Sequence, residues 1–166
     1  MSFRVNTGLR LALEEEAKRL GVNMNTLVCK IFNQYANWER YADRMKLLPV
    51  SKDILREMFQ PFHKEMIEAT ARRLGESSAK EQVLFLFHQL NLGTVVRFIE
   101  LWGEHFEATE HTSDGKRHYF TMRHDINLNF SVFAKEYLSA LLRGALAKNV
   151  LFETLSPNSV TFSFEP

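Results

Sequence analysis

The sequence predicts an α+β protein in which a strand and two helices are followed by a helical segment and a β-β-α-β-β region. Three patterns support this fold class. Residues 2–7 alternate between polar and apolar, residues 9–102 repeat apolar side chains at helical spacing, and residues 105–164 alternate again on either side of one apolar helix. Because Pro49 disfavours helix just before it, we expect a boundary there between domains of residues 1–45 and 46–166.

The first segment, residues 2–7, has the period of a half-buried strand. Its polar side carries Ser2, Arg4 and Asn6, and its apolar side carries Phe3 and Val5. The exposed side therefore presents a hydroxyl, a guanidinium and an amide. In the alternative interpretation, this strand is the edge of a sheet in the larger domain.

Two helices are expected next. The first ends at Gly21, a residue suited to the left-handed conformation that closes a helix, and Asn23 can cap the second, which runs toward Met45. Each helix carries an apolar stripe: Leu9, Leu13, Ala17 and Leu20 in the first, and Met24, Leu27, Val28, Ile31, Tyr35 and Trp38 in the second. About forty residues cannot enclose a core by themselves. We therefore expect a homodimer in which two strands pair antiparallel and four helices close over their apolar side.

Residues 2–40 resemble the ribbon-helix-helix family of DNA-binding repressors, of the Arc and MetJ type. The similarity lies in the strand Ser-Phe-Arg-Val-Asn, the helix Leu-Arg-Leu-Ala-Leu-Glu-Glu-Glu-Ala-Lys-Arg-Leu-Gly and the turn Gly-Val-Asn-Met-Asn that opens the second helix. The resemblance implies base contacts from the outward strand residues and phosphate contacts from the start of the second helix. In this chain these residues are Ser2, Arg4 and Asn6 for the bases, and Met24 and Asn25 for the phosphate.

The chemistry of these groups suits double-stranded DNA. Arginine matches O6 and N7 of guanine, asparagine matches N6 and N7 of adenine, and the amides at the start of a helix suit a phosphate. Residues 1–48 hold eight Lys or Arg against five Asp or Glu, a charge of +3, whereas the remaining residues total −2. A dimer would double the positive charge, which favours a nucleic-acid partner. The chain departs from the family at Gly8, where an acidic residue or proline is usual, and in having no basic arm before the strand.

The middle of the chain predicts several helices. Ser51 can cap the first, Pro61 suits the first residue of the second, and Gly75 would close it. Further helices are expected over residues 79–90 and 94–102. The run of residues 83–87 is apolar all round, which predicts burial in a core; the alternative is a pocket for a lipid or aromatic ligand.

The last third predicts two hairpins joined by a helix. Strands are expected over residues 105–111 and 116–124, around Asp114 and Gly115, and again over residues 150–155 and 159–164. A two-residue turn at Asp114 and Gly115 would pair four histidines on one sheet face, His111 opposite His118 and His105 opposite His124.

These histidines are candidate metal ligands, but each pair would need a third ligand, for example Glu107 or Asp125. The alternative is a solvated sheet face, and the sequence predicts neither a metal nor another cofactor. A glycine-rich phosphate loop, a Cys-x-x-Cys and a His-Glu-x-x-His are all absent, so we do not expect an enzyme. The single Cys29, the lack of an apolar run of membrane length and the lack of an export signal predict a cytoplasmic protein without a membrane partner.

Together these patterns predict a cytoplasmic, sequence-specific transcription regulator. A homodimer or higher oligomer would bind a pseudo-palindromic operator, as repressors do, while residues 46–166 would oligomerise or respond to an effector. Two alternatives remain at this point. One is an antitoxin or interaction module whose C-terminal domain holds a protein partner; the other is a metal-binding sensor or enzyme that uses the hairpin histidines.

Overall fold

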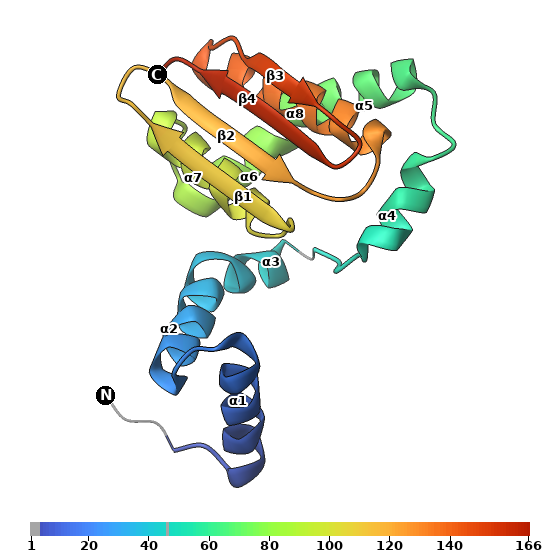
Figure 1. Ribbon diagram of the computed structural model, residues 1–166. Helices are drawn as coiled ribbons and strands as arrows, with labels where there is room; N and C mark the ends of the chain where they lie inside the picture. Colours follow the sequence, from blue (N-terminus) through green and yellow to red (C-terminus); the bar gives the residue numbers. More distant parts are fainter. Residues whose placement is uncertain (1–3, 46) are drawn as a thin grey trace. The chain divides into compact units, whose positions relative to one another are not determined.

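The computed structural model describes residues 4–45 and 47–166, and the chain divides into two compact units (Figure 1). The first, Met1–Leu48, is called the N-terminal unit below, and the second, Pro49–Pro166, the C-terminal unit. Each unit is described by itself.

Helices make up the described part of the N-terminal unit. Their bounds are α1 (Thr7–Leu20), α2 (Met24–Gln34), the π-helical turn η1 (Tyr35–Glu39) and α3 (Arg40–Arg44). The Oδ1 atom of Asn6 accepts a hydrogen bond from the Leu9 amide at 2.8 Å, and Gly21, with φ 67°, ends α1 in the left-handed conformation. Asn23 caps α2 in the same way, so the predicted helix, turn and helix are confirmed.

The predicted N-terminal strand is wrong, and with it the ribbon in the predicted fold class. Residues 4–6 form no strand, and α1 begins already at Thr7. Ser2 and Phe3 lie outside the described residues. The physical reason is that a strand needs the backbone groups of a neighbouring strand, whereas the side chain of Asn6 serves the start of a helix instead.

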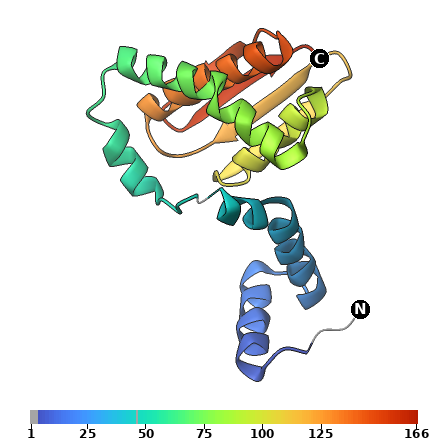
Figure 2. The same cartoon turned by 180° about the vertical axis from the view of Figure 1, so that it is seen from behind.

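The C-terminal unit is α+β and contains the predicted β-β-α-β-β order. Its elements are α4 (Lys52–Phe59), α5 (Lys64–Glu76), α6 (Ser78–Phe87), α7 (Leu92–Gly103), β1 (Ala108–Ser113), β2 (His118–Arg123), α8 (Leu128–Leu146), β3 (Leu151–Leu155) and β4 (Ser159–Phe164). The strands form one antiparallel sheet in the order β1-β2-β4-β3. Helices cover one face of this sheet, as the two opposite views show (Figures 1 and 2).

Side chains along the sheet alternate between its covered face and its exposed face. On β2, Phe120 and Met122 are buried whereas Tyr119 and Thr121 are exposed. A row of rings crosses all four strands on the covered side. His111 lies flat on Phe120 with ring centroids 4.1 Å apart, Phe120 lies 5.1 Å from Phe162, and Phe162 lies 5.5 Å from Phe152.

Several predicted helix ends in this unit are wrong. α5 begins after His63 rather than at Pro61, and it continues through Gly75 to Glu76. Leu84 and Phe85 are exposed, so the run of residues 83–87 is only partly buried. At Gly75 a contact between helices outweighs the local signal, since a glycine inside a helix is tolerated where a neighbour comes close.

Gly75 marks the closest approach between α5 and α8. A Cβ atom at this position would lie 2.3 Å from the carbonyl oxygen of Tyr137 and 2.8 Å from the Cβ of Ala140. Neither atom belongs to a flexible side-chain end, so the two helices would have to move apart. The glycine therefore sets the distance between the two main helices of the unit.

We expect Gly75→Ala to lower the free energy of unfolding of the C-terminal unit by about 1 to 3 kcal/mol, because overpacking forces the backbone to shift. Urea unfolding followed by circular dichroism measures the change. The control is Gly93→Ala in α7, where the nearest atom to the added Cβ is 3.5 Å away. That variant should be as stable as the parent or up to about 1 kcal/mol more stable, and equal losses in both variants would contradict the close-packing argument.

Candidate functional site

The residues predicted to contact DNA bases differ in their surroundings. Arg4 is exposed in the extended segment before α1. Asn6 is also exposed, but its Oδ1 atom accepts the Leu9 amide as the cap of α1. A two-pronged contact to adenine needs both the oxygen and the nitrogen of an asparagine side chain, so Asn6 would have to release its cap to make one.

The start of α2 holds the predicted phosphate contacts. Met24 and Asn25 are the first two residues of this helix, and Asn25 is exposed. The side chain of Asn23 accepts from the Thr26 amide at 2.9 Å. Amides at the start of a helix have no partner within it, and the helix dipole adds a partial positive charge there. This end of α2 is therefore suited to an anion.

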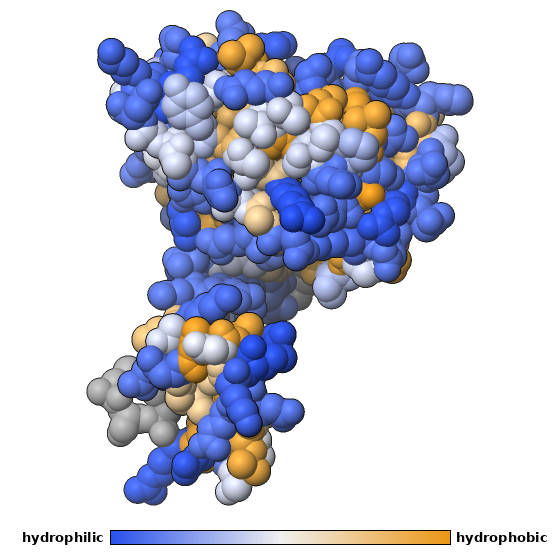
Figure 3. Space-filling model, viewed as in Figure 1, coloured by the Kyte–Doolittle hydropathy of each residue, from blue (hydrophilic) through white to orange (hydrophobic). Residues whose placement is uncertain are grey.

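The apolar stripes of α1 and α2 are only partly covered. Among the described residues of the N-terminal unit, Ala17 and Leu27 alone are buried. Other members of the predicted stripes are exposed, including Leu9, Ile31 and Tyr35. Figure 3 shows hydrophobic residues, in orange, reaching the surface of this unit.

The hairpin of the C-terminal unit has a different register from the predicted one. Ser113 faces His118, and His111 faces Phe120, so the loop is residues 114–117 instead of a two-residue turn. The Asp114 side chain stabilises this longer loop by accepting the amides of Lys116 and Arg117, each at 2.8 Å. The predicted face-to-face pairs His111–His118 and His105–His124 are therefore wrong.

His111 and His118 nevertheless meet, because diagonal neighbours on one sheet face are within reach of long side chains. The Nε2 atom of His111 lies 2.9 Å from Nδ1 of His118, and its Nδ1 atom lies 2.8 Å from Oε1 of Glu100 on α7. The three residues form one hydrogen-bonded chain, called the Glu-His-His chain below. Burial alone would raise the pKa of Glu100, but hydrogen bonds from His111 and Arg97 outweigh it, and the pKa lies below its usual range.

An open hollow of about 390 Å³ adjoins this chain, between α7 and the edge strand β1. Its lining includes Arg97, Glu100, Glu104 and His111. Arg97 forms an ion pair with Glu100 at 3.1 Å, which balances part of the negative charge in the hollow.

A metal site at these histidines finds no support in the geometry. Within residues 4–45 and 47–166, no group of three or more His, Cys, Asp or Glu side chains could hold a metal ion. His111 and His118 direct ring nitrogens at each other, and His124 is buried in a separate network. His105 lies between α7 and β1, away from the pairing that was predicted for it.

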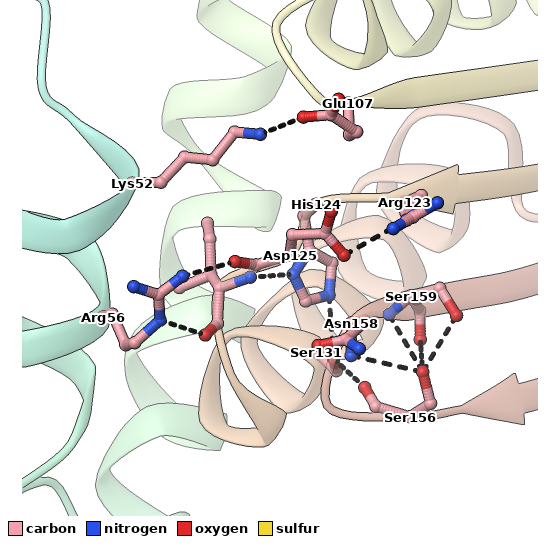
Figure 4. A network of polar contacts seen from close by, with 11 residues as sticks. Lys52, Arg56, Glu107, Arg123, His124, Asp125, Ser131, Ser156, Asn158 and Ser159 are labelled. Carbon is pink, nitrogen blue, oxygen red and sulfur yellow. Dashed lines mark hydrogen bonds and ion pairs between the residues drawn. The ribbon is translucent and has the colours of Figure 1, made fainter.

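His124 is fully buried at the end of β2 and joins three segments (Figure 4). The Ile126 amide donates to its Nδ1 atom at 3.1 Å, so the ring proton sits on Nε2 and is donated to Oγ of Ser131 at 2.8 Å. Ser131 in turn donates to the carbonyl oxygen of Ser156, before β4. Every polar atom of the imidazole thus has a partner only while the ring is neutral.

The loop after His124 also anchors α4. The guanidinium of Arg56 donates to the carbonyl oxygens of Asp125 and Ile126, at 2.8 and 2.9 Å. Asn127 returns a hydrogen bond to the Arg56 carbonyl at 3.0 Å. Asp125 has a positive φ of 54°, a backbone conformation that is uncommon for a residue other than glycine. These contacts indicate a structural role for the His124 network, one that sequence reasoning missed.

Comparison with models of known families gives no match for this chain, and comparison with curated proteins gives no significant relative. In the described part of the chain, no helix combines the length and apolar character that crossing a bilayer requires.

We expect the protein to lose stability as pH falls from about 6.5 to 4, in part through His124. Burial, and to a lesser degree the charge of Lys52, lowers the pKa of His124 to about 4, against the opposing effect of Asp125. The unfolded chain binds the proton at higher pH than the folded chain does. The loss of folding stability caused by this protonation is therefore absent above about pH 6.5 and complete below about pH 4. At 1.36 kcal/mol per pH unit the whole penalty is about 3 kcal/mol.

The measurement is the free energy of unfolding at pH 7 and pH 4.5 for the parent, His124→Gln and the control His63→Gln. His63 is exposed, so its variant should keep the pH dependence of the parent. His124→Gln should be less stable at pH 7 but less sensitive to acid. A pH dependence identical to that of the parent in His124→Gln would contradict the buried neutral imidazole.

Proposed function

We propose that the protein is a DNA-binding transcription regulator that acts as a homodimer through its N-terminal unit. The observation that carries the proposal is the partly uncovered apolar surface of α1 and α2, in a unit that also holds an excess of basic residues. The proposal uses the helix pair and the extended segment before it, and it assumes no strand.

A second copy of this chain is the partner that best fits the exposed stripes. In the described part of the N-terminal unit two residues are buried, whereas a stable domain needs a core of many. Exposed members of the stripes such as Leu9, Leu20, Ile31 and Tyr35 would be covered by the same residues of a symmetric partner. Apolar patches of several hundred Å² on a small unit usually mark such interfaces.

Charge and helix geometry support DNA as the ligand. The excess of +3 over residues 1–48 becomes +6 in a dimer, where it would attract phosphates. The first amides of α2, at Met24 and Asn25, suit a phosphate oxygen. Arg4 is exposed and has the side chain that reads guanine best. Because Asn6 is engaged as a cap, Arg4 carries the base contact in this proposal.

The C-terminal unit would supply a function other than DNA binding. It buries a continuous core of its own, which includes Phe98, Phe120, Phe162 and Leu138. A domain with its own core can fold without the DNA-binding unit. The response to an effector is the role we assign to it.

We expect the protein in solution to have twice the 19.4 kDa mass of one chain, and Ile31→Asp to convert it to monomers. Placing a carboxylate in a closed apolar interface costs several kcal/mol. Light scattering coupled to size-exclusion chromatography measures the mass. The control Leu151→Asp changes an exposed leucine of β3 and should leave the mass unchanged; a monomeric parent at micromolar concentration would contradict the proposed dimer.

We expect Arg4→Ala to weaken binding to a selected DNA site by about 1 to 3 kcal/mol, the size of one bidentate base contact. Fragments selected from genomic DNA with the parent protein supply the site, and fluorescence anisotropy over a series of salt concentrations supplies affinity and salt dependence. The control Arg143→Ala removes the same charge from an exposed position on α8 in the C-terminal unit. Equal affinities of Arg4→Ala and parent would refute the base contact, and binding that does not weaken with salt would argue against DNA.

A further inference from the structure

The two imidazoles of the Glu-His-His chain lie nearly parallel to each other and to rings of the sheet. The rings of His111 and His118 are inclined by 22° with centroids 5.1 Å apart, so their nitrogens meet edge to edge. Each ring also lies flat on a phenylalanine, His111 on Phe120 and His118 on Phe164. Stacking on both rings limits how far either imidazole can turn, and the contact between them is therefore sensitive to where their protons sit.

The hydrogen bonds of the chain fix the protons of its neutral state. The carboxylate of Glu100 only accepts, so Nδ1 of His111 carries a proton. The contact between Nε2 of His111 and Nδ1 of His118 needs one proton, which two neutral rings supply from His118. The remaining nitrogen, Nε2 of His118, is then the basic atom of the chain.

One added proton leaves every hydrogen bond in place. It enters at Nε2 of His118, and the proton between the rings can stay on His118 or pass to Nε2 of His111, beside the Glu100 carboxylate. A second added proton is different, because both nitrogens of the central contact would then carry hydrogen and both rings a positive charge at 2.9 Å. Two donors cannot share one hydrogen bond, so the contact has to break.

We propose that Glu100, His111 and His118 form a proton-sensitive latch across the β1–β2 hairpin: the contact between His111 and His118 stays closed with up to one added proton and is opened by a second, while His111 stays bonded to Glu100 of α7. The contact that opens joins the edge strand β1 to β2, so its loss and the repulsion between two charged rings would weaken the hold of β2 on the edge strand. The inference concerns the C-terminal unit alone and holds whether or not the N-terminal unit binds DNA.

The charges around the latch favour the first proton and oppose the second. α7 contributes Glu100, its ion-pair partner Arg97, and Glu104, which lies 3.7 Å from Arg97. The hairpin loop contributes Asp114, and β4 contributes the uncharged ring of Phe164. Burial and then the proximity of His111 lower the pKa of His118, while Glu100 and Asp114 act in the opposite direction.

The test is a pH titration of the imidazole ¹⁵N signals of the full-length chain, in the presence of a metal chelator. In the parent, the pair should take up its two added protons in two separate steps, because the second proton breaks the hydrogen bond between the rings. Amide exchange in residues 109–112, after correction for its slower intrinsic rate at low pH, should accelerate with the second step and not with the first. Both imidazoles titrating together in a single step, or unchanged exchange across both steps, would overturn the latch.

Two variants keep the test independent of folding defects. His118→Asn can still donate a hydrogen bond to His111 but does not titrate, so it should show one step and no acid-induced rise in exchange. His63→Asn changes an exposed histidine and should reproduce the two steps of the parent. A rise in exchange at the same pH in His118→Asn as in the parent would show that the hairpin opens for another reason.

Discussion

A polar group that leaves water has to find its hydrogen bonds inside the protein, and this constraint organises the C-terminal unit. Three histidines belong to the covered side of the sheet or to its end. His124 is satisfied by the Ile126 amide and Ser131, and His111 by Glu100 and His118. In both networks the partners come from different elements, so the hydrogen bonds also hold strands, helices and loops in place.

The two networks respond differently to protons because their geometry differs. The ring of His124 accepts at one nitrogen from a backbone amide that cannot turn away, so any added proton opposes the folded state. The rings of His111 and His118 share a contact in which either one can be the donor. One proton can therefore be accommodated there without loss of a hydrogen bond. The same residue type thus serves as a structural element in one network and as a candidate sensor in the other.

The two units differ in how much apolar surface they bury. The C-terminal unit covers one face of its sheet with helices, of which α7 and α8 contact the strands, and it buries large side chains such as Phe98, Phe120 and Phe162 completely. The N-terminal unit leaves much of its apolar surface exposed, which is consistent with a unit that is completed by a partner. Its basic charge and the start of α2 then give the proposed dimer a surface suited to phosphates.

Local signals in the sequence were sufficient for features that depend on neighbouring residues. The caps at Asn23 and Ser51, the left-handed end at Gly21 and the β-β-α-β-β order all follow from contacts within a few residues. Tertiary structure alone decided the place of Gly75 inside a helix and the pairing of Glu100 with His111. The absence of a strand at residues 4–6 belongs to the same group. Each of these features depends on whether a second element lies close enough to pack or to accept a hydrogen bond. The periodicity of a single segment does not show how far away that second element lies.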